Sequence, residues 1–377
     1  MSPVRPAVHI PVRRATREHL ALCRLARLTP PAALSEIPAD LDWSAFADHA
    51  IAHNLAPLVY THLSALARGG TRAPIPEAVR KRLESDYYFS LALTTTQQAS
   101  FGAIVAALDE RRIAWIPLKG LLFGRTLYGS PEVRPMADLD FLVRPDRLDD
   151  ASAALETLGY ARTVPARRRA THEEMFERHY ARRLGAFNVK VEPHSGLGQA
   201  ARYRVDGDGL WERSVPVARY GIADWGAGAR ALSVEDCLAH LFLHQANAVF
   251  DEIDLRSALD IHELVTQWHP DWDLVLARAR AWRVVTPMFL ALSVTIVLFE
   301  TSVPKAIMDA VRPGALRRAW LERFLDTGGL GLYRFAEHPG WLKRLTVGFG
   351  SMDRPSDALR YALAYAGLRV RDARARE

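Results

Sequence analysis

Apolar residues recur at helical spacing through the first part of the chain, up to about Ser100. The positions that carry this pattern are Leu20, Leu22, Leu25, Leu28, Val79, Leu83 and Tyr87. Two proline-rich breaks, Pro30-Pro31 and Pro74-Ile75-Pro76, interrupt it. The pattern predicts an N-terminal helical region, and we find no candidate chemistry in it.

After Ser100 the pattern changes to short apolar runs separated by turns and helices. Residues 113–118 form one run, which stops at Lys119-Gly120, and residues 139–143 form a second. Residues 187–194 alternate between apolar and polar side chains, as a half-buried strand does. Helices are predicted between these strands, one of them at residues 148–158 with Gly159 as its C-terminal cap.

Helical spacing returns from Leu232 to the C-terminus. Ser233 is the predicted N-cap of the first helix, and Glu235-Asp236 lie in its first turn, where the helix dipole favours acids. Residues 288–299 are the longest apolar run, too short to cross a bilayer, and they predict a buried helix. The C-terminal part is therefore predicted to be helical.

The strand at residues 139–143 is preceded and interrupted by acids. Side chains alternate along a strand, so Asp138 and Asp140 are expected on one face and Leu139, Phe141 and Val143 on the other. Two carboxylates beside a buried strand are costly unless a cation lies between them. Mg²⁺ is the expected cation, since it takes carboxylate oxygens together with substrate phosphates.

The Lys119-Gly120 turn lies between a strand and a predicted helix at residues 121–128. Unpaired backbone amides and the helix dipole make such a helix end suitable for an anion. Alone, this turn indicates little more than a strand-to-helix connection. Together with the Asp138-x-Asp140 strand it predicts a phosphate-binding turn beside a metal site.

Composition indicates an ordinary globular protein, with 49% hydrophobic and 24% charged residues, and 377 residues suffice for two or three domains. The formal charge is +6 and the isoelectric point about 9.4. Arginine supplies nearly all of the positive charge, because lysine occurs only at Lys81, Lys119, Lys190, Lys305 and Lys343. Arginine suits phosphate recognition, but we take the charge as weak support for nucleic-acid binding.

Cys23 and Cys237 each lie in an apolar helical pattern, far apart in the chain. They form neither a disulfide framework nor a metal motif, which suits a reducing compartment. The N-terminal residues lack a continuous apolar stretch, so we expect no secretory signal. The expected location is cytoplasmic, with no membrane partner.

The Lys-Gly turn, the following helix with Tyr128, and the run from Arg134 to Val143 (R-P-M-A-D-L-D-F-L-V) resemble the uncharacterised nucleotidyltransferase family of the DNA polymerase β-like superfamily. In that superfamily a Gly-containing turn opens a helix, a D-x-D strand follows, and a third carboxylate stands on a neighbouring strand. Glu192 is the candidate third carboxylate. The family usually has Asp-x-His at this point, so Glu192 and Pro193 are departures from its pattern.

The resemblance implies an α+β fold, with a polymerase β-like core of a small mixed sheet and flanking helices between two helical regions. The expected domains are residues 1–99, an N-terminal helical region, residues 100–230, the nucleotidyltransferase core, and residues 231–377, a C-terminal helical domain. The implied activity is Mg²⁺-dependent transfer of a nucleoside monophosphate from a nucleoside triphosphate to a hydroxyl acceptor, which releases pyrophosphate.

The same resemblance assigns roles to particular residues. Asp138, Asp140 and Glu192 are the implied catalytic and metal-binding acids, around two Mg²⁺ ions. The implied ligands of the triphosphate are Lys119, the Gly120 amide and Arg134.

Some residues keep two interpretations at this point. Arg134 either faces the triphosphate or braces the Asp pair, and His194 either orients a carboxylate or the acceptor or caps its strand. His240 and His244 lack the glutamate of a zinc-protease motif, so packing explains them better than zinc. A basic segment borders the predicted cleft and either binds polyphosphate or RNA or is a solvated surface; it comprises Arg162, Arg167, Arg168, Arg169, Arg178, Arg182 and Arg183.

The acceptor is not indicated by the sequence: a small molecule, a protein side chain and an RNA end all fit. The oligomeric state is not indicated either. The substitution at Glu192 supports an alternative of a different class, a degenerate member that binds nucleotide or a partner without catalysis. A third possibility is a helical scaffold with an incidental D-x-D.

Overall fold

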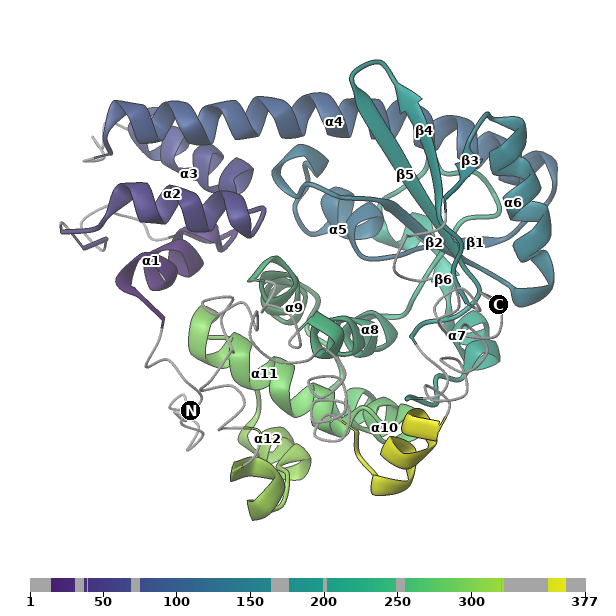
Figure 1. Ribbon diagram of the computed structural model, residues 1–377. Coiled ribbons are helices and arrows are strands. Elements are labelled where there is room, and N and C mark those ends of the chain that lie inside the picture. The colour runs from purple at the N-terminus through teal and green to yellow at the C-terminus, as the bar shows by residue number, and fades with distance from the viewer. Residues whose placement is uncertain are drawn as a thin grey trace, which may run out of the picture.

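The computed structural model describes residues 15–30, 37–38, 40–68, 75–163, 176–198, 202–248, 255–319, 321 and 352–363. Helices at the two ends of the chain flank a mixed β-sheet (Figure 1). The long helix α4 runs along one side of the molecule, from the N-terminal helices to the sheet, and the C-terminal helices lie on the opposite side (Figure 1).

The N-terminal region consists of helices, as the sequence predicts. They are α1 (Arg17–Ala26), α2 (Trp43–Ala52), α3 (Ala56–Arg68) and α4 (Glu77–Glu110). Thr16 and Asp42 cap α1 and α2 by accepting hydrogen bonds from backbone amides of the first turn. The predicted domain boundary between residues 99 and 100 falls inside α4, which continues without a break into the region of the sheet.

Within the described residues, the sheet has five strands in the order β1-β2-β5-β4-β3. Their bounds are β1 (Trp115–Pro117), β2 (Leu139–Val143), β3 (Ala161–Arg162), β4 (Tyr180–Leu184) and β5 (Phe187–His194). Only the β2–β5 pair is parallel, and the other neighbours are antiparallel. The sheet is therefore mixed.

One face of the sheet packs against α4 through aromatic side chains. The Phe101 ring of α4 lies 5.3 Å from the Trp115 ring of β1, and the Trp115 ring lies 6.3 Å from that of Phe141 in β2. Val189 and Val191 of β5 are fully buried. Burial of these large apolar surfaces is the main force that holds the helix on the sheet.

Short elements connect the strands. Helix α5 (Gly120–Thr126) and the 3₁₀ turn η3 (Pro131–Val133) connect β1 to β2. The 3₁₀ turn η4 (Pro145–Arg147) and helix α6 (Leu148–Thr157) follow β2. Gly159 adopts a φ of 81°, the left-handed conformation in which a helix commonly ends, as its predicted capping role requires.

After β5 the chain returns to helices through α7 (Gly207–Arg213), a two-stranded sheet of β6 (Val215–Pro216) and β7 (Arg230–Ala231), and the 3₁₀ turn η6 (Val217–Tyr220). The C-terminal helices are α8 (Val234–Ala248), α9 (Leu255–Trp268), α10 (Trp272–Trp282), α11 (Val285–Phe299) and α12 (Lys305–Val311).

Two sequence predictions for this region are confirmed. The Ser233 hydroxyl accepts a hydrogen bond from the Asp236 amide at the start of α8. Helix α11 contains the apolar run of residues 288–299 and is buried along most of its length.

By length and composition α4 meets the criterion for a bilayer-spanning helix, which core helices of globular proteins also meet.

A buried ion pair joins the sheet region to the C-terminal helices. Arg134, 5% exposed, donates from Nε to Asp260 Oδ1 of α9 at 2.8 Å and from Nη2 to Oδ2. The Tyr128 hydroxyl also donates to Asp260 Oδ1, at 2.9 Å. Such a two-point pairing in the interior strongly constrains orientation, because breaking it leaves a buried charge unpaired.

The observed architecture is the predicted α+β class: a small mixed sheet with flanking helices, between N-terminal and C-terminal helical regions.

We predict that Asp260→Asn lowers the free energy of unfolding by about 3–5 kcal/mol, because it leaves the Arg134 guanidinium buried without its counter-charge. Urea denaturation measures the change. The matched control is Asp40→Asn, which removes a partner from the exposed Arg17–Asp40 pair and is expected to change stability by less than about 1 kcal/mol. Equal effects of the two substitutions would contradict a structural role for the buried pair.

Candidate active site

The register of β2 against β5 places two acids side by side. Asp140 stands opposite Glu192 in the parallel ladder, and Leu139 stands opposite Val191. Since side chains alternate, Asp140 and Glu192 point to one face while Leu139 and Val191 point to the core. Strand β2 begins at Leu139, so Asp138 lies one residue before the strand.

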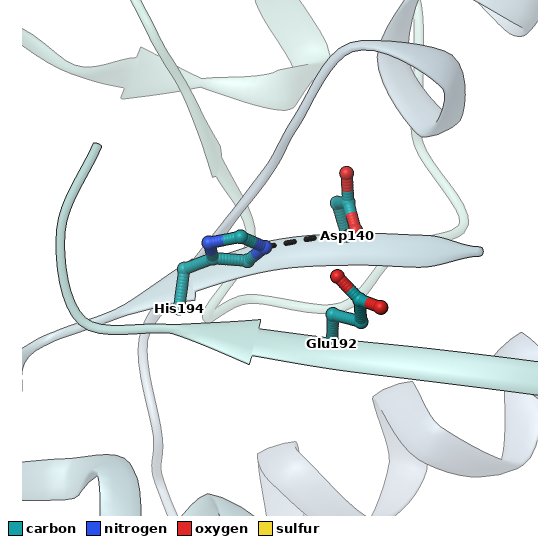
Figure 2. Close-up of side chains that lie close together, drawn as sticks. All are labelled: Asp140, Glu192 and His194. Atoms are coloured by element: carbon teal, nitrogen blue, oxygen red, sulfur yellow. Dashed lines mark ion pairs between the residues drawn. The ribbon is translucent and has the colours of Figure 1, made fainter. Parts of the chain in front are cut away.

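Histidines and a further glutamate extend this cluster. His194 is two residues after Glu192, and its Nε2 lies 3.6 Å from Asp140 Oδ1. Figure 2 shows Asp140, Glu192 and His194 close together, with the imidazole directed toward Asp140. Glu177 Oε2 lies 3.6 Å from His194 Nδ1 on the other side, and His179 Nδ1 lies 2.7 Å from Glu192 Oε1. The sheet thus presents alternating acids and imidazoles on one face.

The segment before β4 brings Glu177 and His179 into place. It continues the antiparallel pairing with β5 beyond the strand: Glu177 forms a bridge with His194, and the Arg178 amide donates to the Pro193 carbonyl at 3.1 Å. Residues two apart in extended backbone share a face. Glu177 and His179 therefore face the cluster.

Lys119 supplies a cation from the turn between β1 and α5. Its Nζ lies 3.1 Å from Asp140 Oδ2, and its side chain is 19% exposed. The backbone of Lys119 has φ 39° and ψ −106°, a left-handed conformation that favours glycine. A lysine held in this conformation is strained, and such strain is concentrated at functional sites.

The charges of the cluster shift one another's pKa values. Burial raises the pKa of the Asp138 carboxyl, and the carboxylates of Asp140 and Glu192 raise it further, to about 7. Burial also opposes ionisation of Asp140, but Lys119 and His194 outweigh it and hold the pKa of Asp140 well below its usual range. One acid of the D-x-D pair is therefore firmly ionised while the other takes up protons near neutral pH.

The pKa values of the two basic groups, Lys119 and His194, are both raised. Burial alone lowers the pKa of the Lys119 ammonium, but the carboxylates of Asp140 and Asp138 outweigh burial and raise it. Burial likewise lowers the pKa of His194, while Asp140 and Glu177 raise it above its usual value. The carboxylates thus outweigh the effect of burial on both groups.

Two sets of side chains among the described residues are close enough to share a metal ion, with ligand atoms within 4.8 Å of one another. One consists of Asp140, Glu192 and His194, and the other of Glu177, His179 and Glu192. Asp138 lies outside both sets, although its carboxyl interacts electrostatically with Asp140 and Glu192. Carboxylates and imidazoles are suitable ligands for divalent ions.

Arg134 differs from what the sequence predicts. It was expected to face a triphosphate or to brace the Asp138–Asp140 pair, but its guanidinium is committed to the buried pair with Asp260. The acid that binds it comes from α9, 126 residues further along the chain, a distance that local pattern does not reveal. Of the three predicted phosphate ligands, Lys119 alone has a charged group at the acid cluster.

Close packing around position 120 leaves no room for a side chain larger than that of glycine. A Cβ at this position would lie 2.6 Å from Met136 Cγ and 2.7 Å from Arg134 Nη1. The turn therefore packs against the Arg134 side chain, which in turn is fixed to α9.

Glu177 and His179 are not among the site residues predicted from the sequence, because they lie within the basic segment. Their spacing of two residues just before a strand is the signal that places them on one face. Within that segment Arg178 pairs with Asp149 at 2.6 Å, and Arg182 and Arg183 are exposed. Arg162 is exposed too, and Arg167, Arg168 and Arg169 lie outside the described residues.

The histidines of α8 have separate surroundings. His240 is buried, and burial together with the positive charge of Lys119 lowers its pKa well below the usual value. His244 Nδ1 lies 3.1 Å from Ser257 Oγ of α9. His240 therefore lies near the cluster as a neutral imidazole.

Comparison with known proteins gives a family for this chain. The model of the uncharacterised nucleotidyltransferase family matches residues 39–300. Among solved structures, the chain is similar to the antibiotic-resistance factor ANT(2'')-Ia, with 17% sequence identity and a TM-score of 0.33, over 50% of this chain and 91% of that one. No curated protein matches the chain. The family match runs from before α2 to the end of α11 and includes every residue of the cluster.

We predict that Lys119→Gly is more stable than Lys119→Ala by about 1–2 kcal/mol, because both lack the ammonium but only glycine tolerates the left-handed backbone without strain. Urea denaturation of the two variants measures the difference. The control is the same pair at Lys81, an exposed position in α4, where glycine is expected to be less stable than alanine by about 1 kcal/mol. Glycine less stable than alanine at both positions would contradict strain at Lys119.

Proposed function

The chain belongs to the uncharacterised nucleotidyltransferase family, and on that basis we propose that it transfers a nucleoside monophosphate from a nucleoside triphosphate to a hydroxyl acceptor, in a Mg²⁺-dependent reaction that releases pyrophosphate. The observation that carries this proposal is the position of Asp140 opposite Glu192, with Asp138 and Lys119 beside them.

The cluster fits a divalent cation. Asp140 Oδ1 is buried and accepts no hydrogen bond from the part of the chain that the structure describes. Burial and the neighbouring carboxylates of Asp140 and Glu192 raise the pKa of Asp138, and a bound cation would offset both effects. Asp138, Asp140 and Glu192 are the residues that would hold Mg²⁺, and we propose two ions. When bound, such ions neutralise charge on the phosphates and make the acceptor hydroxyl easier to deprotonate.

Lys119 is the proposed ligand of the β- and γ-phosphates. Its side chain is partly exposed at the edge of the cluster, and the strained turn fixes the start of that side chain. The Gly120 amide, the first of α5, is a further proposed phosphate ligand. In this assignment Arg134 has an indirect role and does not contact the phosphates. It packs against Gly120 and holds the turn through its pair with Asp260.

In the proposed reaction the acceptor oxygen forms a bond to the α-phosphorus, the bond from that phosphorus to the bridging oxygen breaks, and pyrophosphate leaves. Glu192 is the residue proposed to take the proton of the acceptor hydroxyl or to complete the ligand set on the acceptor side. Its side chain is 19% exposed, so an acceptor can approach it. A small molecule, a protein hydroxyl and an RNA end remain the candidate acceptors.

We predict that Asp140→Asn abolishes Mg²⁺-dependent transfer of label from an α-labelled nucleoside triphosphate, because the amide cannot replace the ionised carboxylate at the centre of the cluster. The assay uses the four nucleotides and a panel of RNA, protein and small-molecule acceptors. Asp208→Asn is the control, since Asp208 is 92% exposed and is expected to leave transfer unchanged. Circular dichroism checks the fold of both variants. Wild-type transfer by Asp140→Asn would refute the assignment.

The alternative is a family member that binds nucleotide without catalysis, and Glu192 in place of the family's usual aspartate favours it. Calorimetry with nucleoside triphosphate, with and without Mg²⁺, is paired with a pyrophosphate-release assay over the same acceptors. Binding together with release supports the enzyme, whereas binding without release supports the binding protein.

A further inference from the structure

His194 is held in an unusual state for a buried imidazole. It is the last residue of β5 and is 8% exposed, yet its Nε2 has no hydrogen-bond partner among the described residues. The atom that it faces, Asp140 Oδ1, is also buried and without a hydrogen bond. The two atoms lie 3.6 Å apart, which is too long for a hydrogen bond.

That separation suits two ligands of one ion better than a direct contact. Imidazole nitrogens and carboxylate oxygens bind an ion such as Zn²⁺ at about 2.0–2.2 Å, so two such ligands lie up to about 4 Å apart. Glu192 completes the set, because one ligand atom from each of the three side chains lies within 4.8 Å of the others. Figure 2 shows the three side chains directed into the same space.

We propose that His194 is a metal ligand, so that Asp140, Glu192 and His194 together hold one of the two divalent ions, and that this ion is Mn²⁺ or another transition-metal ion in preference to Mg²⁺. The inference rests on the proposed function, since it assigns a further ligand to that metal centre.

The groups around His194 support this assignment. A histidine that binds a metal usually directs its second ring nitrogen toward a carboxylate, which fixes the orientation of the ring. Here Glu177 Oε2 lies 3.6 Å from His194 Nδ1, a distance at which the two groups attract each other electrostatically without a direct hydrogen bond. The same Glu177 lies 3.5 Å from His179 Nε2 through its other oxygen, and His179 holds Glu192 at 2.7 Å. One glutamate thus supports two of the three proposed ligands.

The imidazole decides which ion is preferred. Mg²⁺ takes oxygen ligands almost exclusively and keeps several waters. A mixed set of two carboxylates and one imidazole binds transition-metal ions more tightly, because the nitrogen is a softer ligand than oxygen. A centre built only from Asp138, Asp140 and Glu192 would lack this preference.

The test measures binding of Mn²⁺ alone to the purified full chain, with no nucleotide present. Electron spin echo spectroscopy detects modulation from a nitrogen bonded directly to Mn²⁺, and calorimetry gives the Kd values for Mn²⁺ and Mg²⁺. We expect the nitrogen modulation in the wild type and its loss in His194→Gln, with the Kd for Mn²⁺ raised at least about tenfold and the Kd for Mg²⁺ changed less. Glu177→Gln is expected to weaken Mn²⁺ binding while the modulation persists.

His269→Asn is the control: His269 is exposed and has a φ of 47°, which asparagine tolerates, so both readouts should match the wild type. If His194→Gln does not fold, His194→Asp serves instead and should bind Mn²⁺ without nitrogen modulation. The inference is overturned if wild-type Mn²⁺ shows no nitrogen modulation, if the modulation persists without His194, or if Mn²⁺ does not bind. A nitrogen-ligated Mn²⁺ in a protein that releases no pyrophosphate would leave this inference intact and refute the proposed function.

Discussion

The parallel pairing of β2 with β5 is the constraint on which the site depends. It sets Asp140 opposite Glu192, and a shift of one residue in either strand would send the two acids to opposite faces of the sheet. The other face prevents such a shift, because Leu139, Phe141 and Val191 are fully buried there. The apolar core therefore fixes the geometry of the acids: the same alternation that buries one set of side chains aligns the other.

Alignment on one face also concentrates charge, and the fold must compensate for it. Gathering several carboxylates in a partly buried cluster is unfavourable unless cations neutralise them. Basic side chains reach the carboxylates from three separate places: Lys119 from the turn after β1, His194 from the end of β5, and His179 from the segment before β4. Lys119 reaches its position at the cost of a strained backbone. Backbone strain and concentrated charge both cluster at functional sites in proteins.

Local pattern in the sequence predicted much of this arrangement. The alternation along residues 187–194 gave β5 and the orientation of Glu192, and the apolar run after Asp140 gave β2. The commitment of Arg134 to Asp260 was not predictable, since the partner lies on a distant helix and nothing in the local spacing distinguishes it. The contact between His194 and Glu177 was not predictable from local pattern either, because it depends on how the chain returns to pair with the end of β5. Elements follow from periodicity, whereas contacts between elements follow from topology.

The glutamate at position 192 is best understood through the residues that support it. Its side chain has one more rotatable bond than that of an aspartate, so fixing it costs more conformational entropy. The hydrogen bond between His179 and one oxygen of Glu192 removes that freedom and leaves the second oxygen available to the cluster. His179 is itself placed by the backbone pairing that brings Glu177 against His194. A longer acid therefore occurs together with an imidazole that holds it in place, and that imidazole comes from a segment outside the D-x-D motif.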